Sequence, residues 1–476
     1  MLEQITKDNK MKDFNTLHTD FYQLSMTAAY IINDKANEIT GFEGFVRHIK
    51  HTVNSEEIFY IFDGEIEIIE YMDKVKSEIY DPEFLETFIE LIIPKVTADK
   101  QLIEKLIREQ WKTINKEFEY TVIKNGTKVF PLVPVFQYKG AKWLGQILET
   151  MITNIYNGKT GMATLKYFKE QGRDTFVSDE EFDFLERLMN DEQEAINDYS
   201  EMLTQTAKDF RESTDKILLE AAFRRCPSKT TADMASQIAI DNGWDGTSNV
   251  SLRLRDQITD AQIGGTMAHS FVMSFEKERD AFIAWDKIFP GTTILIDTYD
   301  VVNAAELIRD MVDKGEITAP KDVRIDSDPL DIYSVQVDEI FNETFNGKKI
   351  SRINSGAPIE NFVSGDMNIE KFEKFEFEKI PYTKSMAGSR YVYSNIIVEK
   401  LNSGFVYKIV EFINKNGDII RPQKKANGKG NHPGLKQCSY NAISNELTVW
   451  CGTKEGIFGF NDMDKMNTDT KVVFKG

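Results

Sequence analysis

The sequence predicts an α/β fold, organised as a barrel or as a doubly wound parallel sheet. Two short runs with strand character, residues 293–296 and 323–325, are each followed directly by an aspartate, Asp297 and Asp326. A helical pattern at 302–309 comes after the first of them. Strands that alternate with helices form parallel sheets whose ligands lie at the carboxyl ends of the strands. Both aspartates are therefore candidate site residues.

The pattern divides the chain into two predicted domains. Residues 1–140 mix helical stretches with short strands, and the prolines of the run 129–134 suit a strand edge or a turn. Strand and helix patterns alternate from about residue 141 to about residue 400, and residues 401–476 return to β-rich sequence with glycine and asparagine turns. We therefore expect a separate α/β domain before the alternating region.

Composition and charge exclude several classes of protein. With 41% hydrophobic and 11% aromatic residues, the chain is typical of a folded protein. No run approaches the roughly 20 apolar residues that span a bilayer, and the N-terminus shows no secretory signal, so we expect a cytoplasmic location. The formal net charge of −19 argues against nucleic acids and membrane surfaces as partners. A small anionic substrate needs only a local positive pocket, which Arg224, Arg225, Arg324 and Arg390 could supply.

The three cysteines, Cys226, Cys438 and Cys451, are too few for a disulfide framework. The last two lie near His432 in sequence, but their spacing fits no zinc pattern that is built from ligand pairs. Buried free thiols are the better interpretation.

His269 is the histidine that the sequence singles out among five. It follows the glycine-rich turn that begins at Gly264 and Gly265, between two apolar runs. The small residues of this turn let a large anion reach both the backbone and the imidazole. A lone histidine is more often a packed or surface residue. The polar residues that end the predicted strands before and after His269 nevertheless favour a functional site.

Ten short segments occur in the order found in one enzyme family, and the chain resembles the nicotinate phosphoribosyltransferases. The segments are 17–26, 129–134, 148–150, 223–225, those around Asn249 and His269, 297–300, 324–327, 388–390 and 406–411. The resemblance implies an irregular α/β barrel at 141–400. Beside it, the N- and C-terminal portions, 1–140 and 401–476, would together build a second α/β domain.

The resemblance also implies an activity. The family makes nicotinate mononucleotide from nicotinate and phosphoribosyl pyrophosphate, with Mg²⁺ as a cofactor. The resemblance also implies a homodimer. ATP is a co-substrate that phosphorylates the histidine matching His269, because a neutral imidazole can attack a phosphate and the product is reactive enough to couple hydrolysis to binding. Two alternatives stay open: a nicotinamide phosphoribosyltransferase, and a catalytically silent homologue that binds a nucleotide or a protein partner.

Similarity to the family assigns roles around the reacting atoms. Tyr22, reaching across from a neighbouring subunit, and Phe223 are carried over as aromatic walls of a slot for the base. Arg324 is expected to meet the nicotinate carboxylate, since arginine forms two-pronged ion pairs. Asp297 and Asp326 are the carboxylates best placed to stabilise an oxocarbenium-like transition state, although strand-terminal aspartates often only form turns.

Further positions complete the expected substrate site. Arg224 and Arg225 would bind phosphates or help to balance a carboxylate, and Ser327 belongs to the Arg-x-Asp-Ser loop. Ser248 stands where the amide-using relatives carry an aspartate. A carboxylate at that position would accept from an amide and repel an acid, so its absence favours nicotinate.

The phosphate-binding loops are where the sequence departs from the family. The loop 324–330 lacks the family's glycine and contains a proline, which removes a backbone donor. The second loop is expected at 355–358, without its usual aspartate, and the third at 388–390 stays close to the pattern. The expected phosphate contacts are Ser355, Gly356, Gly388, Ser389 and Arg390. A lengthened segment rich in Glu, Lys and Phe, residues 366–383, separates the second loop from the third.

A second departure from the family is an acidic stretch at about 168–217 with apolar residues at helical spacing. This pattern predicts an inserted helical hairpin. It is either a solvated insertion that the fold tolerates, which we favour, or an added subunit contact or lid.

Overall fold

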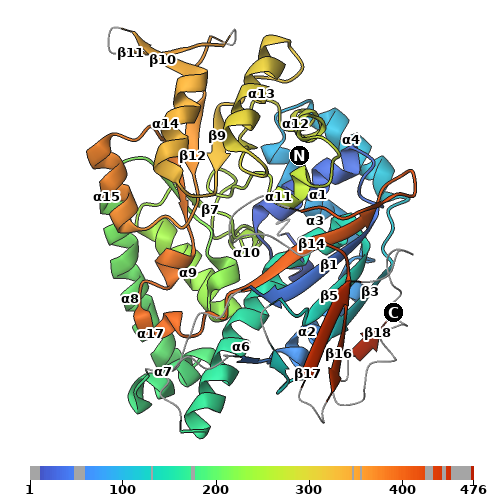
Figure 1. Cartoon of the computed structure of the whole chain (residues 1–476), viewed down its shortest axis with the longest axis vertical. Coiled ribbons are helices and arrows are strands. Elements are labelled where there is room, and N and C mark those ends of the chain that lie inside the picture. Colours follow the sequence, from blue (N-terminus) through green and yellow to red (C-terminus); the bar gives the residue numbers. More distant parts are fainter. Residues whose placement is uncertain are drawn as a thin grey trace, which may run out of the picture.

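The structure is a computed structural model, and it describes residues 11–47, 59–129, 132–172, 177–345, 348–353, 356–423, 433–441, 446–451 and 473–475. Two six-stranded sheets with helices around them make up most of these residues (Figure 1). A search of the described helices finds none with the length and apolar character needed to cross a bilayer.

The first six-stranded sheet is parallel, which confirms the predicted α/β class. Its strand order is β7-β6-β13-β12-β9-β8, so neighbours follow chain order around a ring, as in a barrel. The ring is irregular between β7 and β8, where Thr247 forms a parallel bridge with Ile263 instead. The strands are β6 (Ile217–Glu220), β7 (Gly246–Thr247), β8 (Ile294–Leu295), β9 (Asp322–Ile325), β12 (Glu360–Val363) and β13 (Lys384–Ala387).

Helices surround the parallel strands (Figure 1). Their sequences are amphipathic, and α13 shows why: its buried residues recur at spacings of three and four, which places them on one helix face. The main helices of this region are α8 (Gln193–Glu212), α9 (Lys229–Asp241), α12 (Glu278–Asp286), α13 (Val301–Asp313), α14 (Leu330–Phe341) and α15 (Ile369–Glu378).

The stretch 168–217 contains α7 (Asp179–Met189) and α8, and α8 is not a solvated insertion or a lid. Tyr199 of α8 is fully buried, and its hydroxyl donates to the Val392 carbonyl at 2.9 Å. The Ala207 carbonyl of α8 accepts from Trp244 Nε1 at 3.0 Å. The apolar face of α8 packs on α9 and on the short helix α16 (Ser389–Val392), so this helix is part of the barrel wall.

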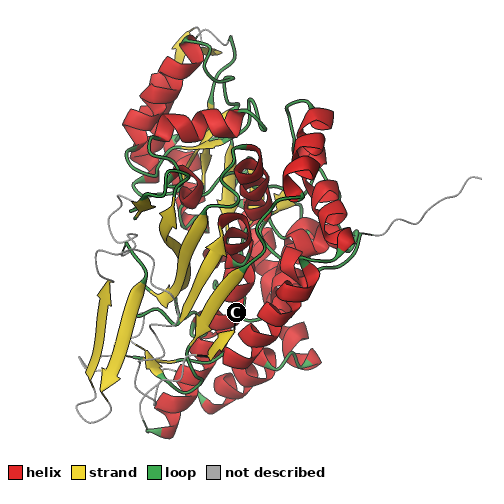
Figure 2. Cartoon of the chain, turned by 90° about the vertical axis from the view of Figure 1, so that its right-hand side faces the viewer, coloured by secondary structure: helices red, strands yellow, loops and turns green. Residues whose placement is uncertain are grey.

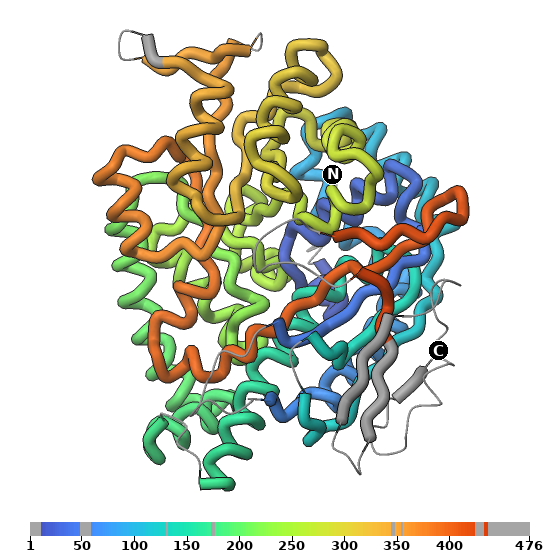
Figure 3. Tube along the Cα trace, in the orientation of Figure 1, coloured from blue at the N-terminus to red at the C-terminus, as the bar shows by residue number. Residues whose placement is uncertain are grey.

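The second six-stranded sheet brings together strands from both ends of the chain. Its order is β15-β14-β1-β5-β3-β18, and β14 runs antiparallel along β1 from the pair Thr40 and Phe412 to the pair Val46 and Phe405. Figure 3 shows the C-terminal segment beside the N-terminal one. The strands are β1 (Ile39–Val46), β3 (Phe118–Val122), β5 (Phe136–Ala141), β14 (Phe405–Ile413), β15 (Ile419–Ile420) and β18 (Val473–Lys475). The exact domain boundaries stay a prediction.

Helices from the first half of the chain lie along one side of these strands (Figure 2). They are α1 (Phe21–Ile32), α2 (Glu65–Glu78), α3 (Pro82–Ile92), α4 (Lys100–Trp111), α5 (Lys142–Ile147) and α6 (Glu149–Glu170). The smaller elements are η1 (Asn15–Leu17), η2 (Ile93–Lys95), η3 (Phe223–Arg225), α10 (Val250–Leu254), α11 (His269–Val272), α17 (Ile396–Glu399), and the pairs β2 (Tyr60–Ile61) with β4 (Lys128–Val129), β10 (Asn342–Phe345) with β11 (Lys348–Ser351), and β16 (Lys436–Asn441) with β17 (Glu446–Cys451).

Candidate functional site

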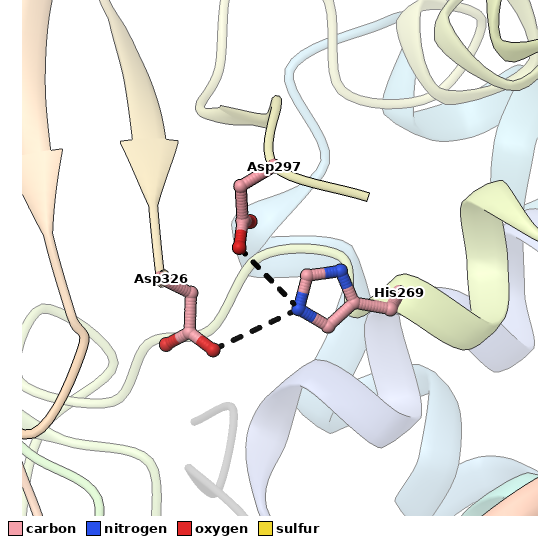
Figure 4. Close-up of side chains that lie close together, drawn as sticks. All are labelled: His269, Asp297 and Asp326. Atoms are coloured by element: carbon pink, nitrogen blue, oxygen red, sulfur yellow. Dashed lines mark ion pairs between the residues drawn. The ribbon is translucent and has the colours of Figure 1, made fainter. Parts of the chain in front are cut away.

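His269 is the first residue of α11, directly after the glycine-rich turn. Its imidazole faces the two strand-end aspartates (Figure 4): Nε2 lies 3.8 Å from Asp297 Oδ2 and 3.7 Å from Asp326 Oδ2. Nδ1 lies 3.2 Å from the Thr298 hydroxyl oxygen. The structure thus brings together the three residues that the sequence predicted as catalytic.

The two aspartates lie close together because they follow adjacent strands. Asp297 comes after β8 and Asp326 after β9, and these strands pair in parallel. The Ser327 hydroxyl donates to Asp297, and the Ser364 hydroxyl donates to Asp326 Oδ1 at 2.7 Å. Ser327 was expected here from the sequence, whereas Ser364 is a residue that sequence reasoning missed.

The group formed by His269, Asp297 and Asp326 has the composition of a cation site. One ligand atom from each residue lies within 4.8 Å of the others. Mg²⁺ prefers oxygen ligands, whereas an imidazole nitrogen suits transition metals. The two aspartates therefore fit the expected Mg²⁺, and the histidine fits a different role.

Arg324 lies on β9 and is buried, with 8% of its surface exposed. Nη1 donates to the Thr266 hydroxyl at 2.8 Å, and the buried Nε has no hydrogen-bond partner among the residues that the structure describes. Among the described residues no carboxylate forms an ion pair with this guanidinium, and a buried charge without a partner is costly. The position therefore favours an anionic ligand, and its pairing with a nicotinate carboxylate stays a prediction.

Arg224, in η3, forms ion pairs with two buried carboxylates. Its Nη1 lies 2.9 Å from Glu149 Oε1, and its Nε lies 3.3 Å from Asp20 Oδ2. Burial acts to lower the pKa of Arg224, but the negative charge around it prevails and holds that pKa above its ordinary value. Carboxylates of the protein thus pair with the Arg224 guanidinium, so this group is less suited to bind a phosphate than the sequence suggested.

The Tyr22 ring belongs to the site of its own chain. The Arg224 Cζ atom lies 5.5 Å from the ring centroid, and the charges of Arg224 and Arg324 both act on the phenol. The Tyr22 backbone packs on the glycine turn so closely that a Cβ on Gly265 would lie 2.4 Å from Tyr22 N. The start of α1 thus docks on the barrel of the same chain, and the expected reach of Tyr22 into a neighbouring subunit finds no support in this arrangement.

Phe223 does not form an aromatic wall. Its side chain is 0% exposed, and its carbonyl accepts from Asn154 Nδ2 at 2.9 Å. The tight turn of η3 directs this ring into the core while the next residue, Arg224, reaches the site. The prediction for Phe223 is wrong, since no face of a fully buried ring is available to a ligand.

Ser248 is buried, and its hydroxyl donates to Asp20 Oδ1 at 2.6 Å. The other Asp20 oxygen accepts from the Thr150 hydroxyl at 2.9 Å. Burial raises the pKa of Asp20. A carboxylate therefore lies beside position 248 even though that position holds a serine. Sequence reasoning missed Asp20, although it stands inside the matched segment 17–26.

Arg225 lies near a second arginine that the sequence analysis did not identify. Arg225 Nη1 donates to the Phe405 carbonyl at 2.9 Å, and Arg47 follows β1, next to the start of β14. Burial and the nearby charge of Arg225 lower the pKa of Arg47 to about 10, and within the described part of the chain the buried Arg47 Nε has no hydrogen-bond partner. Two crowded guanidinium groups favour an anion beside them. The signal in the sequence is an arginine directly after the strand 39–46.

The expected phosphate loop at Gly388, Ser389 and Arg390 follows β13 and lies at the same edge of the sheet as Asp326. Gly388 is required there, because a Cβ would lie 2.5 Å from the Ala221 carbonyl oxygen. Ser389 begins α16, and Arg390 is exposed. The geometry agrees with a backbone cradle for an anion, which stays a prediction.

Gly356 does not belong to the second loop at this edge of the sheet. Gly356 is exposed with open space around it and precedes β12, at the opposite edge of the sheet, while Ser355 lies outside the described residues. The residues that follow β12 are Ser364 and Gly365, and a Cβ on Gly365 would lie 2.9 Å from the Asp326 carbonyl oxygen. A Ser-Gly pair directly after the strand 360–363 was the signal that locates this loop.

The fold and these residues define an α/β-barrel protein whose strand ends gather His269, Asp297 and Asp326 near a buried arginine, Arg324. No family model matches the chain. It is 25% identical over 339 residues to a nicotinate phosphoribosyltransferase of Caenorhabditis elegans, covering 60% of this chain and 50% of that one. It is 23% identical over 348 residues to a nicotinate phosphoribosyltransferase of Bacillus subtilis (strain 168), covering 72% and 58%.

Solved structures show the same relationship at the level of the fold. A putative nicotinate phosphoribosyltransferase from Saccharomyces cerevisiae has a TM-score of 0.56 at 16% identity, covering 87% of this chain and 94% of that one. The nicotinate phosphoribosyltransferase from Porphyromonas gingivalis has a TM-score of 0.55 at 15% identity, covering 88% and 95%. The chain is thus related to the nicotinate phosphoribosyltransferases, as the motifs predict. The sequence matches span about half the length of the curated relatives, 50% and 58% for the two named above.

The contact between Gly265 and Tyr22 gives a test of the site geometry. We expect Gly265→Ala to destabilise the protein by about 1–3 kcal/mol, because the added Cβ must displace the start of α1. Gly264→Ala is the matched control, since a Cβ there meets nothing within 4 Å. Thermal unfolding of the two variants measures the difference, and equal melting temperatures would contradict the close packing of Tyr22 on this turn.

Proposed function

We propose that the chain is a nicotinate phosphoribosyltransferase, which forms nicotinate mononucleotide and pyrophosphate from nicotinate and phosphoribosyl pyrophosphate. One observation carries this proposal: the buried Arg324 guanidinium near Tyr22 has no ion-pair partner within the described part of the chain. A flat anionic ring would pair with the guanidinium and contact the aromatic side chain. The names of the curated relatives support the same reaction.

The reaction forms a bond between the ring nitrogen and the anomeric carbon and breaks the bond from that carbon to the pyrophosphate oxygen. Positive charge develops on the ribose as the pyrophosphate leaves. Asp326 and the buried Asp297 end adjacent strands and supply negative charge at one point. Carboxylates that are already in place stabilise such a charge without reorganisation in the transition state.

Mg²⁺ is part of the proposal, with Asp297 and Asp326 as the residues that would hold it. When bound, it neutralises charge on the departing pyrophosphate. The phosphate groups would lie against the guanidinium groups of Arg47 and Arg225, and against backbone amides of the loops 364–366 and 388–390.

ATP is proposed as a co-substrate: its γ-phosphoryl group would pass to a nitrogen of His269 as the bond to ADP breaks and ADP leaves. The two carboxylates near Nε2 favour a proton on that nitrogen, which leaves Nδ1 as the nucleophile. Nδ1 lies beside the Thr298 hydroxyl, which can hold the ring in this orientation. The proposed phosphohistidine therefore forms at Nδ1, on the side of the ring away from the aspartates.

The proposed assembly is a cytoplasmic homodimer in which each chain builds its own site from its own Tyr22. A catalytically silent role is less well supported, because His269 faces Asp326, and the charge of Arg324, two residues before Asp326, acts on Tyr22. Nicotinamide is the second candidate base. The observation in its favour is the Asp20 carboxylate beside Ser248, which could accept from an amide.

The choice of base is tested by comparing kcat/KM for nicotinate and nicotinamide with purified protein. We expect nicotinate to be preferred by roughly tenfold to hundredfold, since nicotinamide leaves the buried guanidinium unpaired. Arg324→Gln should remove this preference, and Ser248→Asp should erode it by adding a second carboxylate beside Asp20. Arg279→Gln is the control, because Arg279 pairs with Asp310 and Glu316 on the outer surface. Equal use of both bases by the wild type would favour the nicotinamide alternative.

The role of His269 is tested separately with ATP labelled at the γ-phosphate. We expect His269→Ala to abolish the acid-labile phosphoprotein and ATP hydrolysis while leaving slow, ATP-independent ribosyl transfer. The reason is that the aspartates and Arg324, which act on ribose and base, remain in place. Phosphoprotein at the wild-type level in this variant would mean that another residue accepts the phosphate.

The location of Tyr22 within its own chain predicts the behaviour of mixed assemblies. Tyr22→Ala and Arg324→Ala chains, co-expressed with different tags and isolated as heterodimers, should show no more activity than either parent, because each site then lacks one residue. Recovery of activity would require Tyr22 to act across the interface. Failure to form any dimer would contradict the proposed assembly.

A further inference from the structure

The lengthened segment 366–383 places a lysine on the altered phosphate loop. It forms α15, whose first turn follows the β12 loop, and Asn368 caps the helix by accepting from Lys371 N at 2.9 Å. Lys371 Nζ donates to both Asp328 oxygens, at 3.1 and 3.3 Å, and to the Gly365 carbonyl at 2.9 Å. One ammonium group therefore bridges the loops that follow β9 and β12.

These two loops present groups to the histidine site. Asp328 stands two residues after Asp326, and the Ser364 hydroxyl donates to Asp326 Oδ1 at 2.7 Å. The backbone of Gly365 packs directly on that of Asp326. A group that holds the Asp328 side chain and Gly365 together thus acts at the edge where the proposed phosphoribosyl substrate binds.

The charge of Asp328 is a problem for an anionic substrate. Its side chain is 63% exposed at an edge that already carries Asp297, Asp326 and Asp366. Within the described ranges, the cation paired with Asp328 is Lys371, whose side chain is 28% exposed. Because the pair is partly exposed, its effect on a bound anion depends on ionic strength.

We propose that Lys371 is a positioning residue that neutralises Asp328 and holds it on the β12 loop, so that the phosphate groups of the substrate can bind beside Asp326. This inference rests on the proposed function. It assigns to α15 a role at the altered loop 324–330, where the Asp328 carboxylate would otherwise face the phosphates. The next lysine of the helix, Lys374, pairs with Asp331 and Glu378 and does not contact Gly365.

The test compares Lys371→Gln with the matched control Lys374→Gln. We expect Lys371→Gln to raise KM for phosphoribosyl pyrophosphate by roughly three- to tenfold, with KM for nicotinate and the melting temperature unchanged. The increase should shrink at high salt, Lys371→Arg should restore the wild-type value, and adding Asp328→Asn to Lys371→Gln should lower KM again. Lys374→Gln should behave as wild type.

Equal increases of both KM values, or a lower melting temperature with no change in KM, would overturn the proposal and leave Lys371 a structural residue. Calorimetric binding of inorganic pyrophosphate separates this outcome from failure of the proposed function. If the wild type shows no turnover, the enzymatic proposal fails, while weaker pyrophosphate binding by Lys371→Gln than by Lys374→Gln still supports the role of Lys371. Equal pyrophosphate binding by the two variants overturns it.

Discussion

The pairing of the Arg224 guanidinium with Asp20 and Glu149 is the interaction on which the site depends. It joins the residue before α1, the first residue of α6 and the turn after β6, which are distant in sequence. Removing one partner of a buried ion pair typically costs about 3–5 kcal/mol, because the other charge is left uncompensated. Tyr22 stands two residues after Asp20, so the same pairing fixes the aromatic ring of the proposed base slot.

The arginines of the site fall into two groups: those that pair with carboxylates of the protein, and those that stay available to pair with an anionic ligand. Arg224 pairs with two carboxylates, whereas the buried Arg324 has, in the described ranges, only the Thr266 hydroxyl as a side-chain hydrogen-bond partner. The charges of Arg47 and Arg225 repel each other. The chain carries a formal net charge of −19, so its surface as a whole repels anions. Attraction of an anionic substrate must therefore come from these few buried groups, and burial strengthens it by excluding water.

The sequence was informative for reactive side chains that stand at the end of a predicted strand or after a glycine-rich turn. Asp297 and Asp326 could be predicted because parallel strands deliver their carboxyl ends to one edge, and His269 because a glycine-rich turn precedes it. The prediction for Phe223 failed for a different reason: which way a ring turns from η3 depends on packing that no local pattern encodes, and the same is true of where α1 docks. The error at Gly356 was avoidable, since a phosphate loop must follow a strand and Gly356 precedes one.

The altered loops show how a glycine missing from one loop can be matched by a glycine on the neighbouring loop. The loop after β9 lacks the family's glycine. The neighbouring loop after β12 supplies Gly365, whose backbone packs so closely on that of Asp326 that there is no room for a Cβ. Adjacent parallel strands place their terminal loops in contact, so flexibility lost from one loop can be provided by the next. The loops that follow β9, β12 and β13 therefore determine the backbone geometry of this edge together. The phosphate site proposed at this edge therefore depends on the three loops together and not on any one of them.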